Sequence, residues 1–167
     1  RQVHETTVLH ATSKDCGKGL FQERDYTADA LITNEPGLAL VVFSADCGIL
    51  LLHDPVHHAI GAIHAGWRGC AAGIVEKTVQ SMTQAFGTQP KDLLAAVGPC
   101  ISPCCFETDQ DVPDAMTAAL GAQAAPLMQR RGVKWHVDLA GLNRQWLLRA
   151  GVLPDHVETC GLCTACH

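Results

Sequence analysis

Cys47 and His64 are the two residues whose types and spacing most clearly suggest chemistry, and they stand seventeen residues apart. Each closes a short apolar run, residues 38–43 before the first and 58–63 before the second, and both runs predict β-strands. If the two strand ends meet, a thiolate and an imidazole lie side by side. Such a pair can bind a metal ion, or can act as a nucleophile and its base. A buried free cysteine that only packs near a core histidine would give the same pattern.

A series of short motifs follows a fixed order along nearly the whole chain. They are Gln2-Val3-His4, residues 27–33, Ser44-Ala45-Asp46-Cys47, residues 64–69 (His-Ala-Gly-Trp-Arg-Gly), residues 98–107 (starting Gly-Pro-Cys), Asp138-Leu139 through Asn143, and Gly161-Leu162-Cys163-Thr164. With this series the sequence resembles the bacterial laccase-domain family, whose members have been called polyphenol oxidases and, more recently, purine nucleoside phosphorylases. Each motif alone is weak, but their shared order is specific.

The resemblance implies a metal site. In that family the histidine of the first motif, the cysteine of the Asp-Cys motif and the histidine before Ala-Gly-Trp-Arg-Gly bind one zinc ion, so the implied ligands are His4, Cys47 and His64. Zinc accepts cysteine sulfur and histidine nitrogen, and three protein ligands leave a fourth position for water or substrate. A zinc ion can also lower the pKa of bound water to about 7. Because the ligands are far apart in sequence, unlike those of small zinc fingers, we interpret the site as catalytic.

Four further residues are candidates for roles around these ligands. Asp46 is a candidate catalytic residue, as an acceptor for a ligand or as a proton carrier, with a turn cap as the structural alternative. Arg68 is expected at the start of a helix over residues 67–86, where a guanidinium suits phosphate, although a solvated surface arginine fits as well. Asp29 could hold a ribose hydroxyl or shape a turn, and Cys100 lies in a loop expected to line the substrate pocket.

The family resemblance implies an enzyme that acts on purine nucleosides with zinc as cofactor. The implied reactions are phosphorolysis of adenosine, inosine, guanosine or methylthioadenosine by phosphate, and deamination of adenosine. The family's older label gives the main alternative, a copper-dependent polyphenol oxidase, because copper accepts the same ligands. The chain lacks the His-x-His motifs typical of multicopper oxidases, which places this alternative second. A non-enzymatic metal or redox module, suggested by nine cysteines, comes third.

Composition favours an intracellular globular enzyme with small-molecule partners. The chain has 167 residues and a net charge of −5, without the basic stripe by which a nucleic-acid binder neutralises phosphates. No apolar run reaches the roughly 18 residues of a membrane span, and no signal-peptide pattern stands at the start. We therefore expect a reduced, cytoplasmic protein that binds neither nucleic acid nor membrane. The sequence leaves the oligomeric state open.

The expected fold class is α/β (α+β): one layered domain over residues 1–167, with a mixed β-sheet flanked by helices. The predicted strands are residues 38–43, 49–53, 58–63, 93–97, 136–138 and 156–159, and the predicted helices are 67–86, 109–120 and 139–148. The chain does not begin with Met, and it lacks a Thr-Arg-x-Gly-Gly motif and an aromatic-Ser-Tyr-Arg-Arg-Asp motif that flank this region in the family. We therefore expect N- and C-terminal family segments to be missing.

The last residues contain a second cysteine pattern. Cys163-x-x-Cys166-His167 matches the c-type haem attachment pattern, and it can also be part of an iron–sulfur or zinc cluster. The resemblance explains the preceding Gly-Leu-Cys-Thr as a family motif without haem. We therefore interpret the haem match as a coincidence of spacing.

Overall fold

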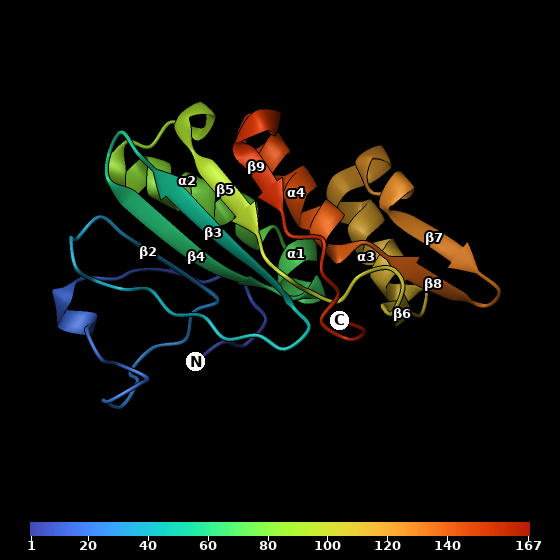
Figure 1. Cartoon of the computed structure of the whole chain (residues 1–167), viewed down its shortest axis with the longest axis horizontal. Helices are drawn as coiled ribbons and strands as arrows, with labels where there is room; N and C mark the ends of the chain where they lie inside the picture. Colours follow the sequence, from blue (N-terminus) through green and yellow to red (C-terminus); the bar gives the residue numbers. More distant parts are fainter.

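A six-stranded mixed sheet forms the body of the molecule in the computed structural model, which describes residues 1–167 (Figure 1). Its strands are β1 (Val8–His10), β2 (Ala30–Thr33), β3 (Gly48–Asp54), β4 (Ala59–Ala65), β5 (Leu94–Val97) and β9 (Val157–Thr159). They lie in the order β1-β2-β4-β3-β5-β9. The outer pairs β1–β2 and β5–β9 are parallel, and the inner pairs are antiparallel. The expected mixed sheet is confirmed.

A second, antiparallel sheet of three strands lies at one end of the molecule (Figure 1). Its strands, in the order β6-β8-β7, are β6 (Glu107–Thr108), β7 (Met128–Arg131) and β8 (Lys134–Val137). Helix α3 (Asp111–Leu120) follows β6 and buries Val112, Met116 and Leu120. The sequence predicted α3 and a strand near β8, but not the separate sheet to which β8 belongs.

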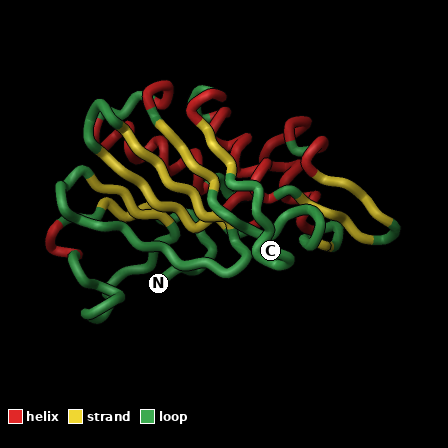
Figure 2. The backbone as a smooth tube through the Cα atoms, viewed as in Figure 1, coloured by secondary structure: helices red, strands yellow, loops and turns green.

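Two longer helices cover one face of the six-stranded sheet (Figures 1 and 2). Helix α2 (Ile74–Phe86) buries Val75, Val79 and Met82, which recur at helical spacing, and α4 (Leu139–Arg149) begins at an Asp138 cap. They pack on the inner sides of β2 to β5, and the hydrophobic core of 26 buried residues continues from there into α1 (Trp67–Ala71), α3 and β8. None of the helices is long and apolar enough to cross a membrane.

Residues 38–43 do not form the predicted strand. They run as a loop over residues 34–47, drawn in green in Figure 2, and their side chains are partly or fully exposed. Phe43 has its backbone N–H and C=O paired with the side chain of Gln2, at 2.8 and 2.7 Å, in place of a neighbouring strand. The prediction was wrong because an apolar run alone does not supply a partner for the backbone.

The predicted helix over residues 67–86 is in fact two helices. Helix α1 (Trp67–Ala71) ends after five residues, and α2 begins after Gly73. Gly73 has a φ of 77°, in the left-handed region that breaks a right-handed helix. A Cβ at this position would also lie 3.3 Å from the Trp146 ring, so the bend lets α4 pack closely against it.

Candidate metal centre

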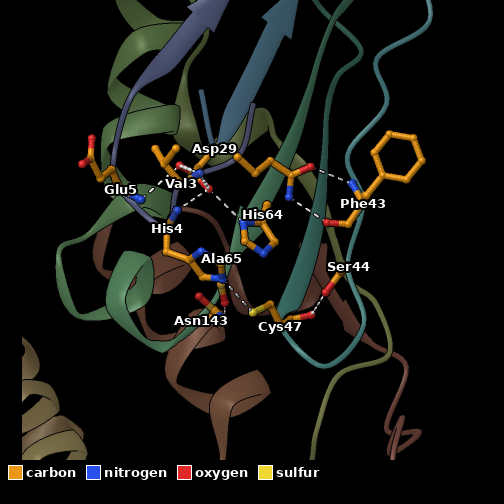
Figure 3. A network of polar contacts seen from close by, with 11 residues as sticks. Val3, His4, Glu5, Asp29, Phe43, Ser44, Cys47, His64, Ala65 and Asn143 are labelled. Carbon is orange, nitrogen blue, oxygen red and sulfur yellow. Dashed lines mark hydrogen bonds and ion pairs between the residues drawn. The ribbon is translucent and has the colours of Figure 1, made fainter. Parts of the chain in front are cut away.

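The structure brings the three expected ligands, His4, Cys47 and His64, to one place (Figure 3). Their potential ligand atoms all lie within 4.8 Å of one another. The Sγ of Cys47 is 3.7 Å from the Nε2 of His4, and the two imidazole centroids are 4.8 Å apart at an interplanar angle of 78°. His64 is buried, Cys47 is half-buried and His4 is exposed. This candidate metal centre therefore has one side open to solvent.

The β3–β4 pairing explains why Cys47 and His64 meet. In this antiparallel pair, Gly48 lies opposite Ala65 and Ile49 lies opposite His64. Cys47 immediately precedes β3, so its thiol lies next to the end of β4, which carries His64. The predicted proximity is correct, but Cys47 lies just before a strand and does not close one, because residues 38–43 form a loop.

Gly66 leaves the space in which the cysteine and the first histidine approach each other. A Cβ at this position would lie 2.7 Å from the Cys47 Sγ and 3.0 Å from the His4 Cδ2, closer than atoms pack. The φ of Gly66 is −63°, which any residue can adopt, so the requirement is for space and not for backbone freedom.

Asp29 is the buried centre of the hydrogen-bond network around the site (Figure 3). Its carboxylate accepts the backbone N–H groups of Val3, His4 and Glu5 at 3.0–3.2 Å. Its Oδ1 also lies 2.9 Å from the Nδ1 of His64. A carboxylate at Nδ1 fixes the proton there and leaves Nε2 free for a metal, the usual arrangement behind a histidine ligand. Asp29 thus holds residues 3–5 and His64 in position relative to each other.

The same N–H groups hold the backbone of the first histidine in an unusual conformation. His4 has a φ of 62°, which is uncommon for a residue with a side chain. The bonds from consecutive N–H groups to one carboxylate compensate this strain, since they wrap residues 3–5 around Asp29. The N-terminal segment and β4 therefore share a single anchor.

The electrostatics of the site follow from burial and charge. Burial alone would raise the pKa of Asp29, but the hydrogen bonds from Glu5, His64, Val3 and His4 outweigh it and hold that pKa below its usual range. Burial raises the pKa of the Cys47 thiol, and the negative charges of Asp46 and Asp29 add to this effect. The carboxylate is thus anionic at neutral pH, as a hydrogen-bond acceptor for a ligand histidine must be.

The remaining predicted site residues lie around the centre in different settings. Asp46 is exposed, and its Oδ1 accepts the Thr164 hydroxyl at 2.6 Å, so it ties the C-terminal tail to the segment before Cys47. Arg68 is exposed and its guanidinium lies 4.3 Å from the Trp67 ring centroid. Arg68 was expected at the start of a long helix whose N-terminus would favour phosphate, but α1 has only five residues.

Cys100, which lies in the loop expected to line the substrate pocket, has a buried side chain. It is 1% exposed, belongs to the hydrophobic core, and pairs in a short parallel bridge with Cys163. Burial raises the pKa of its thiol to about 11. The loop was expected to face substrate because it carries a family motif, but its first cysteine points inward and supports the packing.

Asn143 lies near the site, and its place in a motif was its only predicted feature. Its side chain is fully buried, and its Nδ2 donates to the backbone oxygens of Leu139 at 3.0 Å and Ala65 at 3.5 Å. Its Oδ1 has no partner. Nδ2 would lie 2.7 Å from a Cβ at Gly48. A buried asparagine between α4 and the β3–β4 pair fixes the helix against the strands that carry Cys47 and His64 (Figure 3).

The sequence is similar to those of known proteins. The family model described as multi-copper polyphenol oxidoreductase laccase matches residues 1–167, and the chain belongs to this family. A purine nucleoside phosphorylase of Bacteroides thetaiotaomicron is 40% identical over 169 residues, covering 99% of this chain and 63% of that protein. The purine nucleoside phosphorylase YlmD of Bacillus subtilis is 34% identical over 168 residues, covering 98% of this chain and 59% of that protein.

Solved structures show the same fold. The hypothetical protein YfiH of Bacillus licheniformis superposes with a TM-score of 0.94 at 33% identity, covering 99% of this chain and 63% of that one. YlmD of Geobacillus stearothermophilus gives a TM-score of 0.93 at 32% identity, with the same two coverages. The expected family and the expected α/β fold class are thereby confirmed. The chain spans less than two thirds of the length of these relatives.

Proposed function

We propose that the protein is a zinc-dependent purine nucleoside phosphorylase whose metal ligands are His4, Cys47 and His64. The observation that carries the proposal is the meeting of these three side chains within 4.8 Å, with a buried carboxylate behind His64. The names of the relatives, purine nucleoside phosphorylases, supply the reaction class. The proposed substrates are adenosine, inosine, guanosine and methylthioadenosine with phosphate, and the proposal includes deamination of adenosine.

The donor set fits zinc. One sulfur and two imidazole nitrogens are ligands that zinc readily accepts, and three protein ligands leave one position open. When bound, zinc supplies a Lewis acid that can polarise an oxygen or acidify a water molecule. The exposed His4 places the open side of the centre toward solvent, where a substrate can enter.

The chain's own residues hold and orient this centre. Asp29 keeps the Nδ1 proton on His64 and fixes residues 3–5 by their backbone N–H groups. Gly66 provides the room for Cys47 and His4 to approach. The network therefore presets the ligand geometry, which reduces the cost of organising the site when the metal binds.

Arg68 is proposed to bind the phosphate co-substrate. It lies four residues after His64, is exposed, and stacks on Trp67, which limits the motion of its guanidinium. A planar guanidinium donates two parallel hydrogen bonds to phosphate oxygens. In phosphorolysis a phosphate oxygen forms a bond to the ribose C1′ as the bond from C1′ to the purine breaks, and the base leaves with a proton. An arginine that orients phosphate contributes to this step. It does not contribute to the hydrolytic deamination of adenosine, which uses no phosphate.

A copper-dependent polyphenol oxidase is the competing function, favoured by the family description and by the affinity of copper for the same ligands. The two proposals differ in redox chemistry, since zinc has none. The third interpretation, a metal or redox module without activity, predicts turnover of neither substrate.

One experiment separates these functions. The protein is purified without added metal, analysed for zinc and copper, and assayed in an oxygen electrode with adenosine plus phosphate and, separately, with a phenolic substrate. We expect adenine and ribose 1-phosphate, no oxygen consumption, and no gain from added copper. Loss of bound zinc and of activity in Cys47→Ala would support the ligand assignment. Phenol oxidation proportional to bound copper, without nucleoside turnover by the zinc form, would reverse the ranking.

A further inference from the structure

A second cluster of metal-binding side chains lies outside the candidate metal centre. Cys104, Cys105, Cys163 and Cys166 place their four Sγ atoms within 4.8 Å of one another, and we call them the four-cysteine cluster. All four are free cysteines. Two come from the loop between β5 and β6 and two from the C-terminal tail, which lies beside that loop (Figure 1). Residues about sixty positions apart in sequence therefore converge, since Cys104 and Cys166 have a separation of 62.

Backbone contacts hold the two segments in register. Cys100 and Cys163 form a parallel bridge, and the Thr164 N–H donates to the Cys100 oxygen at 3.3 Å. The Ser102 N–H donates to the Cys163 Sγ at 3.4 Å. The His167 N–H donates to the Cys163 oxygen at 3.1 Å, which closes a turn over Cys166. Metal-binding thiolates commonly receive outer support of this kind, from N–H groups that donate to sulfur and from turns that order the backbone.

We propose that the four-cysteine cluster is a second metal site, a structural one, in which the four thiolates bind a single zinc ion. Zinc–sulfur bonds are about 2.3 Å long, so the sulfurs of a tetrahedral site lie about 3.8 Å apart. The Sγ atoms of Cys104 and Cys166 are 3.7 Å apart. Four protein ligands leave no open position, which is the mark of structural and not catalytic zinc.

Other uses of these cysteines fit the geometry less well. A disulfide requires a sulfur–sulfur distance near 2.05 Å, and Cys104 and Cys166 are much farther apart. Covalent haem attachment needs the thiols of Cys163 and Cys166 to face a cofactor, but they face Cys104 and Cys105. Four sulfurs within 4.8 Å surround one ion and leave no room for a cluster of several irons.

A zinc ion in the four-cysteine cluster would connect the C-terminal tail to the candidate metal centre. The loop that carries Cys104 and Cys105 donates the Ile101 N–H to the backbone oxygen of Asp46 at 2.9 Å. In the tail, Thr164 donates to the carboxylate of the same residue at 2.6 Å. Both segments therefore contact the residue before Cys47, and an ion that joins them would stabilise that segment. The proposal is independent of the reaction catalysed.

Alkylation of the unmodified protein tests the proposal without any substitution. The full protein, purified anaerobically without reductant, is treated with iodoacetamide before and after a zinc chelator, and the modified cysteines are mapped by mass spectrometry. We expect Cys104 and Cys166, which are exposed, to react only after chelation, and the equally exposed Cys16 and Cys160 to react at once. Immediate reaction of all of them would overturn the proposal. Protection that persists after chelation and ends only with a reductant would show a disulfide and overturn it as well.

Metal analysis of variants separates this site from the first. We expect the parent protein to hold two zinc ions per chain, Cys47→Ala to lose one, and the double variant Cys163→Ser/Cys166→Ser to lose the other. Cys160→Ser, in the same tail but outside the cluster, should keep both. A parent with a single zinc ion that only Cys47→Ala removes would overturn the second site and leave the first intact. Iron in place of zinc at full occupancy would contradict the assigned metal.

Discussion

Asp29 is the residue on which both halves of the candidate metal centre depend. One buried carboxylate receives the N–H groups of residues 3–5 and the imidazole of His64. These groups come from two segments, the N-terminal residues before β1 and strand β4. A single acceptor that satisfies four donors can set the distance between two metal ligands without touching the metal itself.

Asp29→Asn should weaken metal binding although none of the proposed ligand residues is substituted. An amide nitrogen in place of Oδ2 would face the Glu5 N–H, so two donors would meet and residues 3–5 would shift. Loss of such an outer partner typically costs about 10- to 100-fold in metal affinity. Competition with a chelator measures the affinity. The matched control is Asp155→Asn, because Asp155 is exposed, and far-UV circular dichroism verifies folding. Unchanged affinity in the Asp29 variant would contradict the positioning role.

Arg68→Ala should separate the two proposed reactions. Removing a guanidinium that binds phosphate costs a charge-assisted hydrogen-bond pair, which corresponds to about tenfold or more in kcat/KM for phosphorolysis. Hydrolytic deamination of adenosine uses no phosphate and should change far less. The control is Arg149→Ala, which also removes an arginine stacked on a tryptophan, 5.0 Å from the Trp146 ring. Equal losses in both reactions would mean that Arg68 supports the fold or the nucleoside.

The sequence predicted the ligands of the candidate metal centre but not the residues that hold them. Histidine and cysteine are recognisable by type, and the family motifs place His4, Cys47 and His64 together. Asp29 and Gly66 act through burial and through missing volume, and neither property can be read from residue type. The burial of Cys100 could not be predicted for the same reason, because a motif does not tell which way its cysteine points.

At the scale of elements, the β3–β4 hairpin determines the site. Its strands were predictable, since their apolar runs are bounded by Asp54-Pro55 and by Gly66. The failures came from long-range partners. Residues 38–43 are as apolar as a strand, but Phe43 at their end pairs its backbone with the Gln2 side chain. The helix over residues 67–86 breaks at Gly73, where α4 packs through Trp146. Periodicity reports which side is buried, but it does not report which element covers it.

Gly66→Ala should test the space that the end of this hairpin provides. The backbone there accepts any residue, so the added methyl group acts only through its close contacts with Cys47 Sγ at 2.7 Å and His4 Cδ2 at 3.0 Å. We expect zinc content to fall well below that of the parent, with thermal unfolding shifted only a few degrees. The matched control is Gly98→Ala, whose Cβ would meet its nearest atom at an ordinary 3.4 Å. Full zinc content in the Gly66 variant would show that the two ligands have room to move apart.

At the scale of the whole molecule, the C-terminal tail is fastened beside the centre by several weak contacts. It meets the β5–β6 loop through the Cys100–Cys163 bridge and meets the segment before Cys47 through Thr164 and Asp46. The Thr164–Asp46 contact is exposed, the Cys100–Cys163 bridge is buried, and neither contact involves a helix. A tail held in this way should open locally unless a further bond, such as the proposed zinc site, closes it.

Thr164→Val should show how much the hydrogen bond from Thr164 to Asp46 contributes to holding the C-terminal tail in place. Valine keeps the shape of threonine but loses the hydroxyl that donates to Asp46 at 2.6 Å, a charge-assisted bond worth about 1.5–3 kcal/mol. We expect hydrogen exchange at residues 45–47 and 163–167 to quicken about tenfold or more after zinc is removed, because the tail then has little else to hold it.

With zinc present the same substitution should have a small effect, since the four thiolates would keep the tail in place even without the hydroxyl. Thr164→Ser retains the donor and should behave like the parent protein in both conditions. Exchange that is equally fast in the parent and in Thr164→Val, with and without zinc, would mean that the loop alone orders the segment before Cys47. The candidate metal centre would then owe its geometry to β3, β4 and Asp29, and the tail would have no part in it.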